Sequence, residues 1–234
     1  MNRYRSEDSV SYSLGMSLTI EALKHASEYV KKVILSEKAA RNEQFGYLLK
    51  LCEDNNVETE YDDRLIGKLS VKENCYCIGV FEKFQRELCS DRHIVLYDFS
   101  DFGELGTVLR SAISFDLKDI VLIGNRIDYF DPRCIRASMG SIFHCNIVTY
   151  DTLDEYLDKY RDHHIFPFVS AGNKKLEDLK LKSPYSIVIS QDYEGLDERY
   201  PDGFCIAHSE LKEISLSIRS SIILCEVYNQ NRSL

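Results

Sequence analysis

The feature that most constrains this chain is a series of short apolar runs in its second half that lack polar alternation. Five such runs recur after residue 92, each of strand length, at residues 94–97, 120–123, 146–149, 165–169 and 187–189. Turn residues or helix-like periodicity separate them. Strands that are apolar on both faces are typical of parallel sheets covered by helices on both sides. The pattern therefore predicts an α/β domain with a parallel sheet over residues 89–234.

The first part of the chain also alternates between helical and strand patterns. Apolar spacing predicts helices at residues 17–30, 45–52 and 65–69, and strands at 33–35, 57–61 and 75–81. The polar stretch from Glu82 to Arg92 resembles a linker between domains. We therefore expect residues 1–88 to form a small α/β module that includes this linker.

The charge balance limits the kinds of partner. Twenty-nine basic and 38 acidic residues give a formal net charge of −9, and no basic tail is present. Such a chain does not attract a polyanion over long range, so any contact with phosphate must come from a local basic cluster. A broadly basic nucleic-acid-binding protein is excluded.

Targeting and metal signals are absent from the sequence. The first residues lack the apolar stretch of a secretory signal, and no apolar run approaches the ~20 residues that span a bilayer. Eight cysteines are scattered, without the C-x-x-C spacing of zinc or redox sites. We expect a cytoplasmic protein with mostly buried, reduced thiols, no membrane segment and no metal.

Common cofactor and hydrolase motifs are also missing. The chain contains no G-x-G-x-x-G, no G-x-x-x-x-G-K-[ST], no G-x-S-x-G and no H-E-x-x-H. Dinucleotide binding, P-loop chemistry and zinc proteolysis therefore have no support.

Three segments carry residues suited to chemistry, and the first spans residues 98–112. A strand ends at Asp98, a turn with Gly103 follows, and an amphipathic helix presents Arg110 away from its apolar face. Gly106, one turn earlier, is expected to leave the backbone accessible beside the guanidinium. Arg110 is thus a candidate for binding phosphate or a polarised hydroxyl, and a solvated helical arginine is the alternative.

The second segment spans residues 131–144. Asp131 is a good N-cap with proline at the first helical position, and Gly140 suits the left-handed end of the helix. Arg133 and Arg136 share one helical face and form the best basic spot of the chain. His144 is either catalytic or, more commonly for a lone histidine, structural.

The third segment runs from Ser190 to Leu196, through Ile206, and into a terminal helix that reaches Glu226. Apolar residues of this helix are available for burial, and its small serines permit close approach of another backbone; the residues are Leu216, Ile222, Ile223, Val227, Ser217, Ser220 and Ser221. Spacing alone predicts a packed C-terminal helix and no more.

Taken in order, these segments resemble the SpoU (TrmH-like) family of RNA ribose 2′-O-methyltransferases in the SPOUT superfamily. Residues 104–112, E-L-G-T-V-L-R-S-A, are similar to that family's N-L-G-x-x-x-R-T-A motif. Residues 136–144, R-A-S-M-G-S-I-F-H, resemble its second motif, and residues 187–226 resemble the outline of its third. The N-terminal part looks like the ribosomal-protein-like RNA-binding module that often precedes this domain.

The resemblance implies a C-terminal trefoil knot that binds S-adenosylmethionine, and a homodimer formed through the C-terminal domain. By motif position, the cofactor-binding residues are Ser190, Gln191, Asp192, Gly195, Leu196, Ile206 and Ile214. Arg110 and Ser215 take the catalytic positions, at which the ribose 2′-hydroxyl is helped to lose its proton. Arg133 and Arg136 become candidate contacts to RNA, either rRNA or tRNA.

The sequence departs from the family pattern at several of these positions. The family's first-motif Asn is Glu104 here, two glycines of its third motif are Ser190 and Tyr193, and its final Asn aligns with Ser215. These changes keep a second hypothesis open, a catalytically weakened member that acts as an RNA-binding or assembly protein. A structural dimer or small-molecule-binding protein unrelated to RNA is the third.

Overall fold

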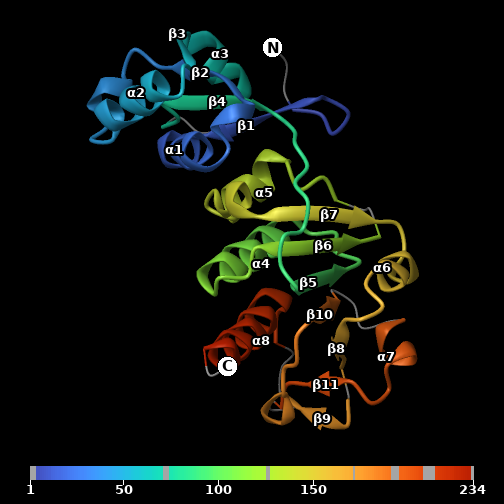
Figure 1. Cartoon of the computed structure of the whole chain (residues 1–234). Coiled ribbons are helices and arrows are strands. Elements are labelled where there is room, and N and C mark those ends of the chain that lie inside the picture. Colours follow the sequence, from blue (N-terminus) through green and yellow to red (C-terminus); the bar gives the residue numbers. More distant parts are fainter. Residues whose placement is uncertain are drawn as a thin grey trace. The chain divides into compact units, whose positions relative to one another are not determined.

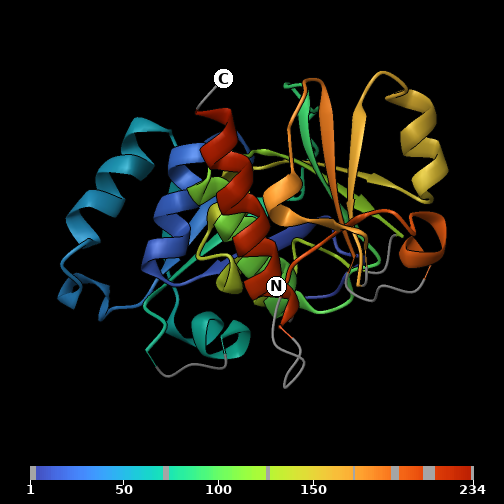
Figure 2. The ribbon, with the colours of Figure 1, turned by 90° about the horizontal axis from the view of Figure 1, so that it is seen from below.

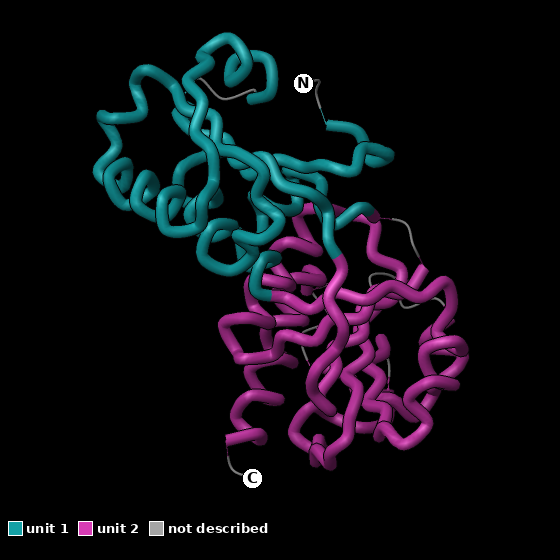
Figure 3. Tube along the Cα trace, turned by 45° about the horizontal axis from the view of Figure 1, so that its top comes forward, with its two compact units in different colours: residues 1–84, 128–144 teal, residues 85–127, 145–234 magenta. Residues whose placement is uncertain are grey.

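The protein is described from a computed structural model (Figure 1) that covers residues 4–70, 74–124, 127–170, 172–190, 195–207 and 214–232. The chain divides into two compact units (Figure 3). Unit 1 contains residues 1–84 and 128–144, and unit 2 contains residues 85–127 and 145–234. The segment 128–144 thus belongs to the unit that holds the N-terminal residues. The sequence division at residues 88 and 89 remains a prediction about domains.

Unit 1 is built on a four-stranded sheet with the order β1-β4-β2-β3. Its strands are β1 (Val10–Leu14), β2 (Val30–Leu35), β3 (Glu58–Tyr61) and β4 (Cys77–Glu82). Strands β2 and β3 are parallel, whereas β4 pairs antiparallel with both β1 and β2. The helices are α1 (Met16–His25), α2 (Phe45–Asp54) and α3 (Asp63–Leu69), close to their predicted positions.

Strand β1 was not predicted, because its inward-facing residues are serines. Ser11 and Ser13 are fully buried, and their hydroxyl groups bond to the Phe130 carbonyl and to Thr19 Oγ1, the latter at 3.0 Å. A buried hydroxyl is tolerated when it finds such a partner. Buried serines with hydrogen-bond partners therefore take the positions in β1 at which a sequence pattern would show apolar residues.

The segment 128–144 forms α5 (Pro132–Ala137) and the short 3-10 turn η3 (Ser141–His144). The Asp131 side chain accepts the Arg133 amide at 2.8 Å, and Pro132 is the first helical residue. Gly140 has a φ of 84° and donates its amide to the Ile135 carbonyl at 3.1 Å. The predicted N-cap and proline position are confirmed; the left-handed conformation predicted at Gly140 is also observed, but α5 ends at Ala137 and Met139, with a φ of 52°, is the first left-handed residue after it.

Unit 2 contains a seven-stranded sheet with the order β7-β6-β5-β10-β8-β11-β9, in which every neighbouring pair is parallel. The strands are β5 (Arg92–Tyr97), β6 (Asp119–Ile123), β7 (Asn146–Tyr150), β8 (His164–Phe168), β9 (Lys174–Lys175), β10 (Tyr185–Ser190) and β11 (Phe204–Cys205). The five apolar runs correspond to β5, β6, β7, β8 and β10. The predicted α/β class with a parallel sheet is confirmed.

Helices cover both faces of this sheet (Figure 2). They are α4 (Phe102–Ser114), α6 (Leu153–Lys159), α7 (Leu196–Arg199) and α8 (Leu216–Asn231). One core cluster joins Val95, Val121 and Val188 of the sheet to Leu153 of α6 and Leu196 of α7. Helices α4 and α8 pack against each other on the opposite face.

The surface of α8 differs from its prediction at one residue. Its buried face carries Leu216, Ile223 and Val227, as expected, but Ile222 is 37% exposed. Ser221 Oγ lies 2.8 Å from Ser111 Oγ of α4, so one of the small serines lies where the two helices pack, and the close approach of another backbone stays a prediction.

The thiols agree with the expectation that most cysteines are buried and reduced. None of the eight cysteines forms a disulfide, and six of them are buried. Burial raises the pKa of the Cys145 thiol to about 12. Among the described residues, no helix is both long and apolar enough to cross a bilayer.

Candidate active site

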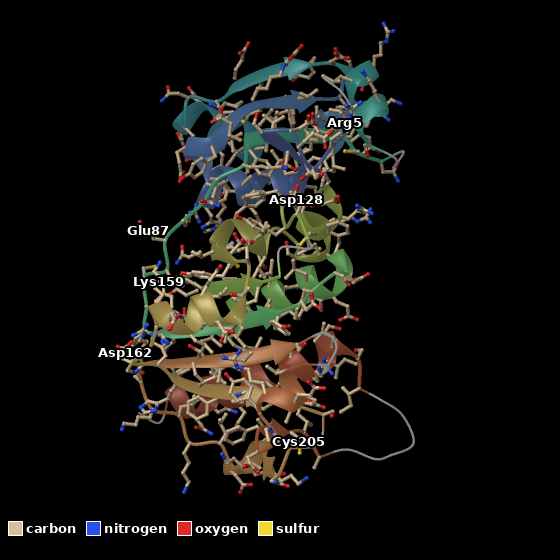
Figure 4. The ribbon with its side chains drawn as sticks, turned by 90° about the vertical axis from the view of Figure 1, so that its right-hand side faces the viewer. Arg5, Glu87, Asp128, Lys159, Asp162 and Cys205 are labelled. Carbon is tan, nitrogen blue, oxygen red and sulfur yellow. The ribbon has the colours of Figure 1, made fainter. Side chains whose placement is uncertain are left out.

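The predicted third-motif residues lie at the edge where the parallel strands of unit 2 end. Tyr97, Ile123 and Ser190 are register partners at the ends of β5, β6 and β10. Figure 4 marks the two edges of this sheet: Asp162 precedes β8 at the amino edge, and Cys205 ends β11 at the carboxyl edge. Ligands of open α/β sheets bind outside the carboxyl edge.

Tight backbone turns follow two of these strands. Asp98 follows β5 in the left-handed conformation with a φ of 61°, and its amide donates to the Ile123 carbonyl at 3.0 Å. Gly124 follows β6 with a φ of 96°, and a Cβ placed on it would lie 3.2 Å from Asp98 Oδ1. A left-handed aspartate is uncommon and is typical of functional turns.

Glu104, the departure in the first motif, contacts the start of the terminal helix. Asp101 caps α4 by accepting the Glu104 amide at 2.8 Å. The Glu104 carboxylate accepts the Ser217 amide of α8 at 2.7 Å. A carboxylate that binds a first-turn amide stabilises a helix through both the hydrogen bond and the helix dipole. Glu104 therefore joins the first-motif helix to the third-motif helix.

Arg219 makes a second connection at this edge, and sequence reasoning did not select it. Its side chain is buried, with the residue 8% exposed, and its Nη2 donates to the Ser190 carbonyl at the end of β10. A usable signal was present, because Arg219 falls on the buried face between Leu216 and Ile223. A charged residue on an apolar face is buried only with a partner, and thus marks a contact.

The predicted cofactor-binding residues lie around these connections. Ser190 and Leu196 are buried, whereas Ile206 and Ile214 are half-buried and Gly195 is exposed. Two further predicted residues, Gln191 and Asp192, lie outside the described residues.

Gly195 leaves open space beside the backbone. It has a φ of 76°, and the nearest atom to a Cβ placed on it is the Tyr97 hydroxyl, at 3.9 Å. Tyr97 therefore joins this edge as an aromatic residue that the sequence interpretation did not name.

Two glycines let the segments around β8 and β11 approach closely next to the site, and we call this close approach the glycine crossing. A Cβ on Gly172 would lie 2.0 Å from the Gly203 carbonyl oxygen, so no side chain fits there. The Val169 amide donates to the Phe204 carbonyl at 2.8 Å, and Cys205 Sγ lies 3.2 Å from the Gly172 carbonyl. The chain after β8 and the chain of β11 are thus in direct backbone contact.

The two predicted catalytic residues lie on different helices, Arg110 within α4 and Ser215 at the start of α8. Arg110 is exposed on α4, and within the described part of the chain its guanidinium has no ion pair. Gly106 is buried, so the expectation that its backbone is accessible is wrong; α4 packs through that position. Ser215 is the exposed N-cap of α8, and its carbonyl accepts the Arg219 amide at 3.0 Å.

The predicted RNA contacts lie on α5 in unit 1 and differ from each other. The Arg133 guanidinium binds Asp131 through Nε at 2.9 Å and Nη2 at 2.8 Å. This bond raises the pKa of Arg133 further. Arg136 is exposed, and no ion pair to it occurs among the described residues. Arg136 is therefore the arginine of this pair that is available to an external phosphate.

His144, left open between catalysis and structure, contacts the N-terminal helix. Its Nε2 lies 2.7 Å from the Glu21 carboxylate of α1, within unit 1. This contact gives it a structural place within unit 1.

Comparison with known proteins finds a family match and several relatives. Residues 91–202 match the model of the SpoU rRNA Methylase family. The 23S rRNA (guanosine(2553)-2′-O)-methyltransferase RlmP of Bacillus subtilis (strain 168) is 24% identical over 116 residues, which are 48% of this chain and 46% of that protein. A 23S rRNA (uridine(2479)-2′-O)-methyltransferase of Streptomyces viridochromogenes is 25% identical over 105 residues, 42% of this chain and 37% of that protein. The matches span less than half the length of either relative.

The fold agrees over almost the whole chain. The crystal structure of the SpoU methyltransferase AviRb from Streptomyces viridochromogenes, in complex with the cofactor AdoMet, has a TM-score of 0.80. It is 17% identical and covers 96% of this chain and 91% of its own. The likeness at this identity concerns the fold. The sequence match covers residues 91–202, somewhat less than half of the chain, and identifies this part as a member of the SpoU rRNA Methylase family.

Proposed function

We propose that this protein methylates a ribose 2′-hydroxyl in structured RNA, with rRNA favoured over tRNA, using S-adenosylmethionine. The observation that carries the proposal is that described residues of the first and third motifs are joined by two hydrogen bonds at one edge. Glu104 holds the Ser217 amide, and Arg219 holds the Ser190 carbonyl. The named activities of the family relatives support the same reaction.

The residues present fit S-adenosylmethionine. The cofactor would be held largely through backbone groups at Ser190, Gly195, Ile206 and Ile214, with Leu196 beneath them and with Gln191 and Asp192 as further proposed contacts. The open space at Gly195, beside the Tyr97 hydroxyl, suits a ligand that approaches the backbone. When bound, the cofactor supplies an electrophilic methyl group on a sulfonium.

Arg110 and Ser215 would act on the ribose. A 2′-hydroxyl is a weak nucleophile at neutral pH, and a guanidinium stabilises the negative charge that develops on its oxygen. The exposed Arg110 guanidinium is free of ion pairs within the described part of the chain and is thus available for that role. Ser215, at the start of α8, would help to position the same hydroxyl.

RNA binding would use unit 1 and α5. Arg136 is the proposed primary phosphate contact, and Arg133 a weaker one because Asp131 already neutralises it. The negative net charge makes such a local contact necessary.

A homodimer through the C-terminal domain and a trefoil knot complete the proposal. Ile218 and Ile222 on α8 are 56% and 37% exposed, next to a groove lined by Thr107 and Cys225. A second copy would cover these apolar side chains. The glycine crossing at Gly172 supports the close chain passage that a knot requires.

The second candidate is a catalytically weakened member that binds RNA or assists assembly. Glu104 favours it, since a carboxylate stands where the family has a neutral amide and would repel an incoming phosphate.

The test begins with calorimetric titration of S-adenosylmethionine, with S-adenosylhomocysteine as control. Methyl transfer is then measured on rRNA, with resistance to alkaline cleavage as the signature of a 2′-O-methyl group. We expect Arg110→Ala to lose at least about 100-fold in rate, and Arg161→Ala, an exposed control paired to Asp158, to keep full activity. RNA binding without cofactor binding or transfer would select the second candidate.

A further inference from the structure

Two histidines and a glutamate converge in unit 1, and none of the three has a role in the proposed methyl transfer. Glu21 and His25 lie one turn apart on α1, and His144 ends η3. His144 Nε2 is 2.7 Å and His25 Nε2 is 3.8 Å from Glu21 Oε2. One ligand atom from each of the three residues lies within 4.8 Å of the other two.

The backbone holds these side chains together before any ligand arrives. Gly140 approaches α1 so closely that a Cβ on it would lie 2.8 Å from Glu21 Cβ. Phe143, next to His144, is fully buried and contacts the Phe81 ring edge-on at 5.2 Å between centroids. A site on rigid, packed elements loses little entropy when it binds a ligand.

The donor set and its spacing suit a first-row divalent cation. Two imidazoles and one carboxylate form a common zinc set that leaves a fourth position for water. Tetrahedral zinc with bonds of about 2.0–2.1 Å places its ligand atoms roughly 3.4 Å apart. The two distances to Glu21, 2.7 and 3.8 Å, lie on either side of that value.

Accessibility and charge also permit binding. The side chains of Glu21, His25 and His144 are 28%, 34% and 24% exposed, so an ion can reach them from solvent. Lys24 Nζ, 3.7 Å from Glu21 Oε1, is the opposing charge. Lys24 sits at the margin of the side-chain cluster and supplies a control.

We propose that Glu21, His25 and His144 bind one Zn²⁺-like divalent cation that fastens the segment 132–144 to α1. The ion replaces the hydrogen bond between His144 and Glu21. The fastened segment carries Arg136 and the exposed Met139, so metal binding orders this surface. The proposal is independent of methyl transfer.

The test is titration of the metal-free full chain with Zn²⁺ by calorimetry, and with Co²⁺ by visible absorption. We expect one ion per chain and a higher melting temperature, by about 5 °C when free zinc exceeds its Kd about 100-fold. Loss of an outer-sphere partner already weakens metal sites about 10–100-fold. His25→Gln and His144→Gln should therefore each weaken binding by about 100-fold or more.

Matched controls separate this site from other metal-binding groups. Lys24→Gln keeps the three ligands and removes a cation, so its affinity should be equal or higher. His164→Gln, an exposed histidine of β8, should bind zinc like the wild type. Glu21→Gln retains the size and hydrogen bonding of the side chain but removes the carboxylate ligand. This variant should fold and bind zinc more weakly than the wild type.

Three results would overturn the proposal. They are unchanged zinc affinity in both His25→Gln and His144→Gln, a cobalt spectrum dominated by thiolate absorption from Cys89 or Cys225, or loss of binding in His164→Gln. Circular dichroism of each metal-free variant establishes that it is folded.

Discussion

The two edges of the seven-stranded sheet in unit 2 are built in different ways. At the amino edge, side chains satisfy one another. The Asp119 carboxylate, 2% exposed, accepts the Cys89 amide at 3.1 Å, the Ser90 amide at 2.8 Å and Asn146 Nδ2 at 2.8 Å. This carboxylate thus fixes the chain that enters β5 against the starts of β6 and β7.

A second network continues along the amino edge. His93 Nδ1 lies 2.8 Å from the Tyr156 hydroxyl, which lies 2.5 Å from Ser186 Oγ. His163 Nδ1 lies 2.9 Å from the same Ser186 oxygen. Burial, and next the neighbouring His163, lower the pKa of His93. Closed networks of this kind rigidify a fold and leave nothing for a ligand.

The carboxyl edge depends on backbone instead. Its contacts run through the Ser190 carbonyl, the Ser217 amide and the crossing at Gly172, and Asp98 adopts a left-handed turn. Side chains there join elements without enclosing the edge. The difference teaches that the amino edge is closed by side-chain hydrogen bonds, whereas the carboxyl edge is held by close backbone contacts and leaves room for a ligand beside its backbone.

The largest expected effect comes from the glycine crossing. Gly172→Ala places a Cβ 2.0 Å from the Gly203 carbonyl oxygen, and backbone cannot yield as a side chain does. We expect a loss of about 4 kcal/mol or more in the free energy of unfolding, or no folded protein. Urea denaturation followed by circular dichroism measures it.

Gly46→Ala on α2 is the control for this substitution. Nothing lies within 4 Å of its added Cβ, so alanine should stabilise by up to about 1 kcal/mol. Equal stability of Gly172→Ala and wild type would mean that the crossing is not tight, and would remove its support for a knot.

The next effect sharpens the amino edge. Asp119→Ala leaves two part-buried backbone amides without their acceptor and should cost about 2 kcal/mol in unfolding free energy. Because this edge is remote from the proposed chemistry, cofactor affinity per folded molecule should stay within a factor of two or so. Urea denaturation and calorimetry give the two values.

Asp158→Ala is the matched control, since Asp158 is exposed and its ion pair with Arg161, at 3.0 Å, lies on the surface. Its unfolding free energy should change by less than about 0.5 kcal/mol. If Asp119→Ala abolished cofactor binding while folded, the division of labour between the edges would be refuted.

Sequence reasoning predicted the parallel sheet because its strands are uniformly apolar, and it predicted α5 because Asp131, Pro132 and Gly140 act locally. It missed β1, whose buried serines are stabilised only by tertiary partners. It also expected Ile222 to be buried, although the helix presents Arg219 inward instead.

Sequence motifs predicted side chains of the candidate site, such as Arg110, but they did not predict the contacts that backbone groups make there. Nothing in the sequence pairs Glu104 with Ser217, which are 113 residues apart, because that contact depends on how α4 and α8 pack. Nor does local pattern bring Glu21 to His144. Contacts between residues that are far apart in the sequence can be identified only once the fold is known.

Lower pH should weaken the amino edge. The folded state holds His93 with a lowered pKa, so the unfolded state binds the proton more readily. Stability from this group is therefore full above the unfolded pKa of about 6.5 and falls as pH decreases below it, by at most about 1.4 kcal/mol per pH unit. Urea denaturation at pH 7.5, 6.5 and 5.5 measures the slope.

His93→Gln should flatten this slope. His163, whose pKa is also lowered by burial, contributes a change of the same sign, so part of the slope should survive in His93→Gln and vanish in the double variant with His163→Gln. An unchanged slope in the double variant would show that other groups control the acid response.

The smallest expected effect decides what Glu104 does at the carboxyl edge. Helix α8 has no acidic residue in its own first turn, so Glu104 supplies the charge at its N-terminus. Glu104→Gln keeps an oxygen for the Ser217 amide and removes the charge, which should cost about 0.5–1 kcal/mol in unfolding free energy. Thermal and urea unfolding detect that loss.

RNA binding at low salt then separates two roles for the same carboxylate. If Glu104 is only a cap for α8, RNA affinity in Glu104→Gln stays at the wild-type value, like that of the exposed control Glu198→Gln. If Glu104 also faces the phosphate, removal of its charge should tighten RNA binding several-fold. The gain should be largest at low ionic strength, where repulsion between the carboxylate and the phosphate is screened least. Tighter RNA binding together with faster methyl transfer in Glu104→Gln would mean that the Glu104 carboxylate stabilises α8 and at the same time weakens RNA binding and slows the reaction.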